Sequence, residues 1–235
     1  MDFSANPDIL ILKIKELCGS RCYRSAEIIV ASSLASLSLS DTKLETVFYR
    51  SQLYDILGDI YSERNEISQS CEYFRLSLNA FEKNQIYIGG NKIISTFLME
   101  VRYKLALILH KSNQNKLAIQ TLEIIPISNR QVKVNMVLGR LYQNEGLVRQ
   151  AILVYKSVLA VNPAIVEAIE YLSQLGANLE DVLKVVKPSK SDADISKSGD
   201  NELFAAGEEM IFTFSKLPFN SFKLYIQASI VLSFQ

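Results

Sequence analysis

Residues Val132 to Pro163 read VKVNMVLGRLYQNEGLVRQAILVYKSVLAVNP, and this stretch decides the fold. A Leu138-Gly139 pair is followed by an aromatic residue, Tyr142, and by a glycine at an expected turn, Gly146. A small residue, Ala151, a second aromatic, Tyr155, and a closing proline, Pro163, complete the pattern. Residues four apart share a helix face, and a mid-helix glycine is tolerable where another helix approaches closely. Gly146 suits the left-handed end of a first helix. Asn162 and Pro163 suit the cap and first residue of a following helix.

This spacing is typical of a tetratricopeptide (TPR) repeat, a helix–turn–helix unit of about 34 residues. A second copy places Leu105-Ala106 before Ala118 and Leu122, and Pro126 ends its second helix early. A third copy matches in the same order, with Leu57-Gly58, Tyr61, Ser70 and Phe74. Repeats need neighbours because one unit cannot bury its apolar face alone, so we expect a continuous array.

The sequence therefore predicts an all-α fold, a TPR solenoid in which helical hairpins stack as a right-handed superhelix. We expect the N-terminal helices to form a degenerate unit, as terminal repeats often do. The predicted divisions are degenerate TPR-like helices over 1–48, repeats over 49–84, 99–131 and 132–165 with an insertion over 85–98, further helices over 166–187, a linker over 188–200, and an incomplete repeat with an atypical tail over 201–235.

Composition narrows the classes of partner. The chain has 235 residues, 21% of them charged, and a formal net charge of zero. A nucleic-acid or anionic-membrane partner favours a basic patch, so we expect neither. We see no secretory signal at the N-terminus and no apolar run of about 18–20 residues. We therefore expect a soluble intracellular protein, and the three cysteines fit reduced thiols.

The sequence offers no catalytic constellation. His110 is the single histidine, which weakens any triad with a serine or cysteine nucleophile. Cys18 and Cys22 are four apart and could flank a metal, but zinc sites need four ligands, so we interpret them as small buried thiols on a helix. No phosphate-binding loop is present. We therefore predict no enzyme activity, no cofactor and no metal.

Protein binding is the expected role, and the first helix of each TPR pair is expected to line an inner groove. The expected groove contacts are Lys133, Met136, Arg140, Gln143, Tyr103 and His110. Neighbouring positions are Glu100 and Leu107, and upstream Gln52, Asp55, Asp59 and Ser62. Met136 and Tyr103 stand where a clamp for a chaperone's C-terminal carboxylate needs lysine, which argues against that class. A solvated groove without a ligand is the alternative.

Several non-consensus residues indicate a particular family. The matching residues are Lys104, Ala106, Ala118-Ile119, Leu122, Ile125-Pro126, Val134-Asn135-Met136, Leu138 and Leu141-Tyr142. With them the chain resembles subunit seven of the anaphase-promoting complex, or cyclosome, over about Cys18 to Phe214, and "GANLEDVLKVV" resembles the plant-type version. The Ile-Pro turn and the Val-Asn-Met run are not TPR consensus, so they discriminate this family from other TPR proteins.

The resemblance implies a non-catalytic scaffold subunit of an E3 ubiquitin ligase that acts in mitosis, in nucleus and cytoplasm. It implies other cyclosome subunits as partners, and a homodimer formed through the N-terminal half. It transfers no active-site residues. Family members are more than twice as long, so we expect a C-terminally truncated isoform or an incomplete gene model. The alternatives are a generic TPR adaptor that binds a short peptide, and a regulatory domain of an enzyme whose catalytic part is absent.

Overall fold

The computed structural model describes residues 7–37, 42–83 and 91–177, and the predicted linker and tail over 188–235 lie outside them. The described residues form α-helices and one short 3-10 helix, with no strand among them. The helices are α1 (Pro7–Gly19), α2 (Tyr23–Ser36), α3 (Leu44–Glu63), α4 (Ile67–Lys83), α5 (Lys92–Lys111), α6 (Asn115–Glu123), the 3-10 helix η1 (Ile127–Asn129), α7 (Val132–Asn144), α8 (Val148–Val161) and α9 (Val166–Gln174). None of these helices is long and apolar enough to cross a membrane.

The chain divides into two compact units, Met1–Gly146 and Leu147–Gln235. Unit 1 holds α1 to α7, and unit 2 holds α8 and α9 among the described helices. The boundary falls at Gly146, which lies inside the stretch Val132–Pro163. The two helices predicted from that stretch therefore belong to different units. The predicted repeat boundaries stay predictions.

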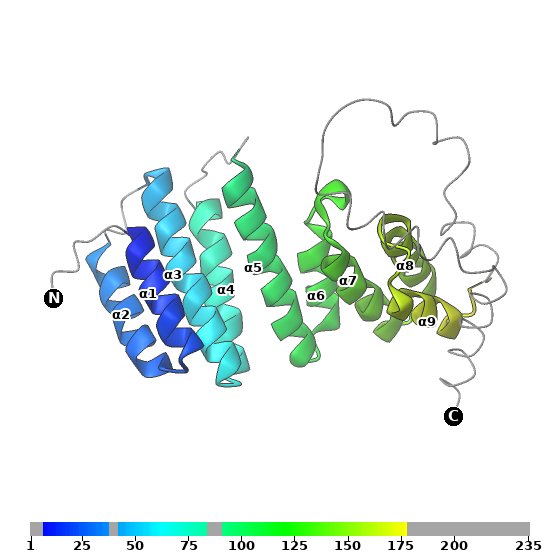
Figure 1. Ribbon diagram of the computed structural model, residues 1–235, viewed down its shortest axis with the longest axis horizontal. Helices are drawn as coiled ribbons and strands as arrows, with labels where there is room; N and C mark the ends of the chain where they lie inside the picture. Colours follow the sequence, from blue (N-terminus) through cyan, green and yellow to red (C-terminus); the bar gives the residue numbers. More distant parts are fainter. Residues whose placement is uncertain (1–6, 38–41, 84–90, 178–235) are drawn as a thin grey trace. The chain divides into compact units, whose positions relative to one another are not determined.

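Unit 1 has the order of contacts expected of stacked helical hairpins (Figure 1). Consecutive helices pack on each other from α1 to α4 and on through α5, α6 and α7. The first helices of the hairpins, α1, α3, α5 and α7, also contact one another in series. Such nearest-neighbour packing is what makes a repeat array nearly one-dimensional, so its stability depends on the interfaces between adjacent helices.

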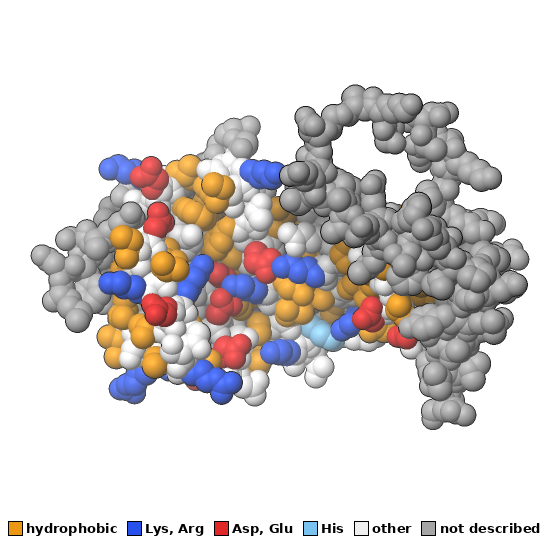
Figure 2. Space-filling view, in the orientation of Figure 1, with side chains coloured by type: hydrophobic (Ala, Val, Ile, Leu, Met, Phe, Trp, Pro, Cys, Tyr) orange, Lys and Arg blue, Asp and Glu red, His pale blue; other side chains and the backbone are white. Residues whose placement is uncertain are grey.

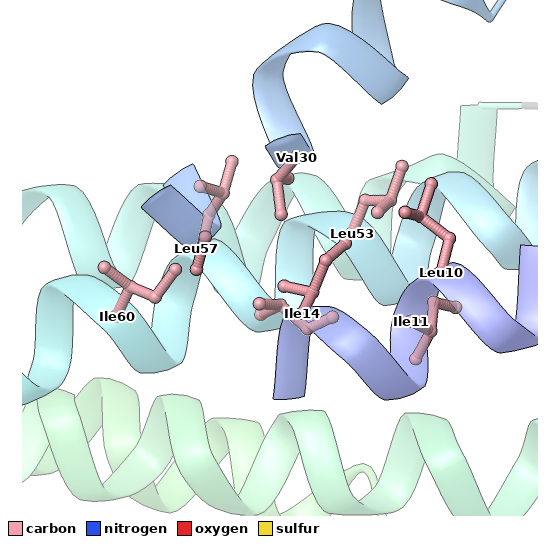
Figure 3. Packing of buried hydrophobic residues seen from close by; sticks show 9 residues of the cluster. Leu10, Ile11, Ile14, Val30, Leu53, Leu57 and Ile60 are labelled. Atoms are coloured by element: carbon pink, nitrogen blue, oxygen red, sulfur yellow. The ribbon is translucent and has the colours of Figure 1, made fainter. Parts of the chain in front are cut away.

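The apolar core of the N-terminal hairpins draws residues from three helices, as the sequence pattern requires (Figure 3). Ile14 of α1, Val30 of α2 and Leu53 of α3 are fully buried. Leu10, Ile11, Leu57 and Ile60 surround them. Because each helix contributes one apolar stripe, the degenerate N-terminal segment packs against α3 as the first hairpin of unit 1.

The glycine of the third predicted copy confirms the close approach of two helices. A Cβ built on Gly58 of α3 would lie 2.5 Å from Cε1 of Phe74 in α4, so only glycine fits beneath that ring. Ser70, the predicted small residue, is fully buried, and its hydroxyl donates to the Gly58 carbonyl at 2.8 Å. These residues fix the crossing of α3 and α4.

The turns show which local predictions hold. Gly146 has φ +72° and follows α7 as predicted. After α6 the chain turns through Pro126 into η1, and the Arg130 guanidinium donates to the carbonyl oxygens of Ile125 at 2.8 Å and Glu123 at 3.1 Å. These bonds satisfy orphan carbonyls at the end of α6.

One local prediction is wrong. Asn162 and Pro163 do not start the next helix, because α9 begins at Val166. Instead Asn162 Oδ1 accepts from the Ala164 N–H at 3.0 Å, which closes a turn before the helix. Residues 92–98, expected within an insertion, are helical and form the first turns of α5, with Asn91 Oδ1 accepting from the Ile94 N–H at 3.2 Å as the helix cap.

Candidate functional site

The expected groove contacts all lie on first helices of unit 1. Tyr103 and His110 belong to α5, and the remaining contacts belong to α7. We call the surface formed by these positions, together with Asp55 and Asp59 of α3, Glu100 and Lys104 of α5, the first-helix face. Figure 2 shows acidic and basic side chains interspersed over the part of unit 1 where α3, α4 and α5 lie.

The centre of the first-helix face is an ion cluster between α3 and α5. Asp55 and Asp59 are four residues apart, so one helix face carries both carboxylates. The Lys104 ammonium donates to both oxygens of Asp55 at 2.9 Å and to Oδ2 of Asp59 at 2.7 Å. It also lies 5.8 Å from the centre of the Phe74 ring. One lysine thus joins two first helices.

Burial and charge shift the acidity of this cluster. Burial, and less strongly the neighbouring Asp59 charge, raises the pKa of Asp55 to about 6 although Lys104 acts in the opposite direction. Burial also raises the pKa of Asp59. The two carboxylates raise the pKa of Lys104 against the effect of its burial. Burial disfavours the charged form of a carboxyl group, and for both aspartates this effect outweighs the opposing attraction of Lys104.

A second lysine joins α5 to α7 in the same manner. The Lys133 ammonium donates to Oε2 of Glu100 at 2.6 Å and lies 4.8 Å from the centre of the Tyr103 ring. The side chains of Lys133 and Glu100 are each 41% exposed, so solvent screens the pair. Two of the expected groove contacts, Lys133 and Tyr103, are therefore engaged with each other.

The remaining expected groove contacts are one residue of α5, His110, and three residues of α7. His110 Nδ1 lies 2.7 Å from Oδ1 of Asn115, which holds the turn between α5 and α6. Met136 and Gln143 are half-buried, and Arg140 is exposed. The structure does not test whether any of these residues binds a partner, so their role stays a prediction.

Sequence reasoning assigned no role to Lys104 on this face. A single offset of 49 residues separates Asp55 from Lys104, and the same offset separates Phe48 from Phe97, whose rings meet edge to face at 5.3 Å. The Glu100–Lys133 offset is 33, close to one repeat. The offset of 49 exceeds the repeat length because additional residues lie between α4 and α5. Only an alignment of the repeats that includes this insertion could have paired Lys104 with Asp55.

The described residues contain no group of three or more histidine, cysteine, aspartate or glutamate side chains that could hold a metal ion. Cys18 is half-buried near the end of α1, whereas Cys22 is exposed and precedes α2. The two thiols therefore do not share a helix, and Cys22 is not the buried residue that we expected. Cys71 of α4 is buried, and burial raises the pKa of its thiol.

Sequence comparison supports the resemblance found in the motifs. No family model matches the chain. Over 191 residues it is 29% identical to anaphase-promoting complex subunit 7 of Dictyostelium discoideum, covering 76% of this chain and 32% of the relative. It is 33% identical to the Arabidopsis thaliana protein of that name, covering 49% and 20%, and 37% identical to the Homo sapiens one, covering 36% and 15%. The chain spans about a third or less of these relatives.

Solved structures confirm the fold class. YrrB, described as a TPR protein with an unusual peptide-binding site, superposes with a TM-score of 0.54 at 18% identity, covering 75% of this chain and 80% of YrrB. A Podosopora anserina protein with nearly identical TPR-like repeats gives a TM-score of 0.54 at 13% identity, covering 79% of this chain and 94% of that protein. At these identities the likeness shows the TPR fold alone.

Proposed function

We propose that the chain is a non-catalytic scaffold segment of the anaphase-promoting complex, acting through protein–protein contacts. The observation that carries the proposal is the match to three relatives from different eukaryotes, each named subunit 7 of that complex. The TPR fold supports it, because stacked helical hairpins present extended binding surfaces. In this proposal the chain serves an E3 ubiquitin ligase of the cell cycle, in nucleus and cytoplasm, and performs no chemistry itself.

The proposal also includes a homodimer formed through the N-terminal helices. Apolar side chains are exposed there, with Leu12 of α1 at 69% and Ile28 of α2 at 60%. Ile9 is 48% exposed three residues before Leu12, so both lie on one face of α1. A second copy covering this surface would remove it from water, and apolar burial is the main driving force of association.

Affinity purification of the tagged chain from dividing cells tests the scaffold proposal. We expect other subunits of the complex to copurify in stable proportion. Recovery of a single unrelated partner would favour the peptide adaptor instead, and the scaffold proposal would then fail.

Light scattering coupled to size exclusion tests the dimer separately. At micromolar concentration we expect a dimer, which Leu12→Asp converts to a monomer. The matched control is Leu153→Asp in α8, where the side chain is 68% exposed but belongs to unit 2. A wild-type monomer at that concentration would refute the homodimer.

A further inference from the structure

The first-helix face has an apolar end that adjoins its charged centre. Phe48 and Phe97 form an edge-to-face pair at 5.3 Å, and each ring is half-buried. One turn before them, Leu44 is 36% exposed and Ile93 is 73% exposed. Spacing by four residues places Leu44 with Phe48 and Ile93 with Phe97 on the same helix faces. Two adjacent helices thus present a shared apolar surface to solvent.

The two helices run in one register along this face. The offset of 49 residues that pairs Phe48 with Phe97 also pairs Asp55 with Lys104. The apolar pair and the ion cluster are therefore successive layers of the same interface between α3 and α5. A partner segment lying along these helices would meet the apolar layer first and the charged layer next.

The charged layer carries more carboxylates than its lysine satisfies. Asp59 is 47% exposed, and within the described residues it accepts only from Lys104, through Oδ2. Glu63, four residues on, is exposed, and its charge raises the pKa of Asp59 after the larger effect of burial. Lys15 of α1 is the other basic group whose charge acts on Asp55 and Asp59. A further cation docked here would relieve the repulsion between carboxylates.

We propose that this face binds a partner segment carrying an apolar side chain followed by a basic one, with the apolar group on Phe48, Phe97 and Ile93 and the basic group between Asp59 and Glu63. The inference rests on the proposed protein-binding function and adds the chemistry of one partner. Phe48 and Asp59 are 11 residues apart on α3, which corresponds to about 16 Å of helix. An extended segment crosses that distance in about five residues.

The probe is a library of random twelve-residue peptides displayed on phage and selected on the full 235-residue chain. We expect enrichment of peptides in which arginine or lysine follows an aromatic or aliphatic residue by about five positions. An enriched peptide is then synthesised, and its affinity is measured by fluorescence anisotropy at low and high salt. Enrichment of acidic peptides, or of no spacing at all, would overturn the proposal.

Two substitutions at exposed positions separate the two layers. Glu63→Gln removes the proposed ion pair between Glu63 and the basic group of the peptide. Because this pair is exposed to solvent, we expect binding to weaken only about two- to fivefold and to depend less on salt concentration. Ile93→Ser is expected to weaken it about tenfold, through lost apolar contact, and to leave the salt dependence unchanged. The matched controls are Glu72→Gln, exposed on α4, and Leu153→Ser, exposed on α8 in unit 2. Equal effects of variants and controls would refute the assigned face.

Copurification of the same variants separates this inference from the proposed function. Loss of peptide binding by Ile93→Ser with unchanged recovery of complex subunits supports both. Absence of any selected peptide, with normal recovery of subunits, overturns the inference alone. Specific peptide binding without recovery of subunits overturns the scaffold proposal and leaves this binding face standing.

Discussion

Replacing Gly58 with alanine should destabilise unit 1, although alanine is the better helix former. The new Cβ would lie 2.5 Å from Cε1 and 2.6 Å from Cδ1 of Phe74, distances that real Cβ contacts do not show. Phe74 is 1% exposed, so its ring has no solvent-filled space to enter. Overpacking of this kind costs about 1–3 kcal/mol, whereas the gain in helix propensity is about 1 kcal/mol. We expect a net loss of up to about 2 kcal/mol.

Urea unfolding followed by circular dichroism measures this loss, and a loss of about 2 kcal/mol corresponds to a melting temperature lower by about 4–8 °C. The matched control is Gly19→Ala at the end of α1, where a new Cβ meets nothing within 4 Å. That variant is expected to be neutral or slightly stabilised. A double-mutant cycle with Phe74→Leu should recover at least about 1 kcal/mol of the Gly58→Ala cost. If Gly58→Ala raised the stability by its full propensity gain, the close crossing of α3 and α4 would be refuted.

Three further predictions concern other parts of the fold. The raised pKa of Asp55, about 6 against 3.8, means that the folded state binds its proton more tightly than the unfolded state. Wild type should therefore lose up to about 3 kcal/mol of stability relative to Asp55→Asn as the pH rises from 4 to 7 in urea titrations, and the opposite slope would show that the Lys104 pair dominates. Ala151→Trp should cost about 1–3 kcal/mol or more, because Ala151 is fully buried, and unchanged thermal unfolding would contradict the repeat register. Gly146→Val should destabilise through its φ of +72°, whereas Gly146→Asn should cost less in the same melting assay.

Much of the local fold could be predicted from sequence because the TPR pattern encodes steric relations. The spacing places Gly58 at the glycine position and Phe74 at the aromatic position of a repeat, and the structure shows that the Phe74 ring lies directly over the glycine. Ser70 was assigned as a small residue, but spacing could not show that its hydroxyl donates to the Gly58 carbonyl. A serine at this position is as small as the pattern requires, and it also forms a buried hydrogen bond. That bond depends on the positions of both Ser70 and Gly58, so the residue type at one position does not predict it.

The candidate site was less predictable because it depends on register between helices that are distant in sequence. The expected inner positions did include Asp55 and Asp59, but their lysine comes from α5 after an irregular stretch of chain. The helical start of α5 at Lys92 was also not predicted, because the sequence pattern places residues 85–98 in an insertion. The helix cap predicted at Asn162 is wrong because the local sequence is ambiguous. An asparagine before a proline fits both a helix cap and an isolated turn, and the structure shows the turn.

The two lysine bridges show that charged residues on the first-helix face can hold neighbouring helices together instead of binding a ligand. Lys104 joins α5 to α3, and Lys133 joins α7 to α5, so these two first helices each carry a lysine directed at the preceding first helix. In a repeat array the interfaces between neighbours carry the cooperativity, so removing Lys104 should weaken the coupling between hairpins more than the stability of either hairpin. Asp55 is buried and Lys104 is half-buried, so loss of Lys104 leaves a buried carboxylate without its cation. A partner that binds this face gains little by displacing Lys104 and more by pairing with the carboxylates that remain exposed.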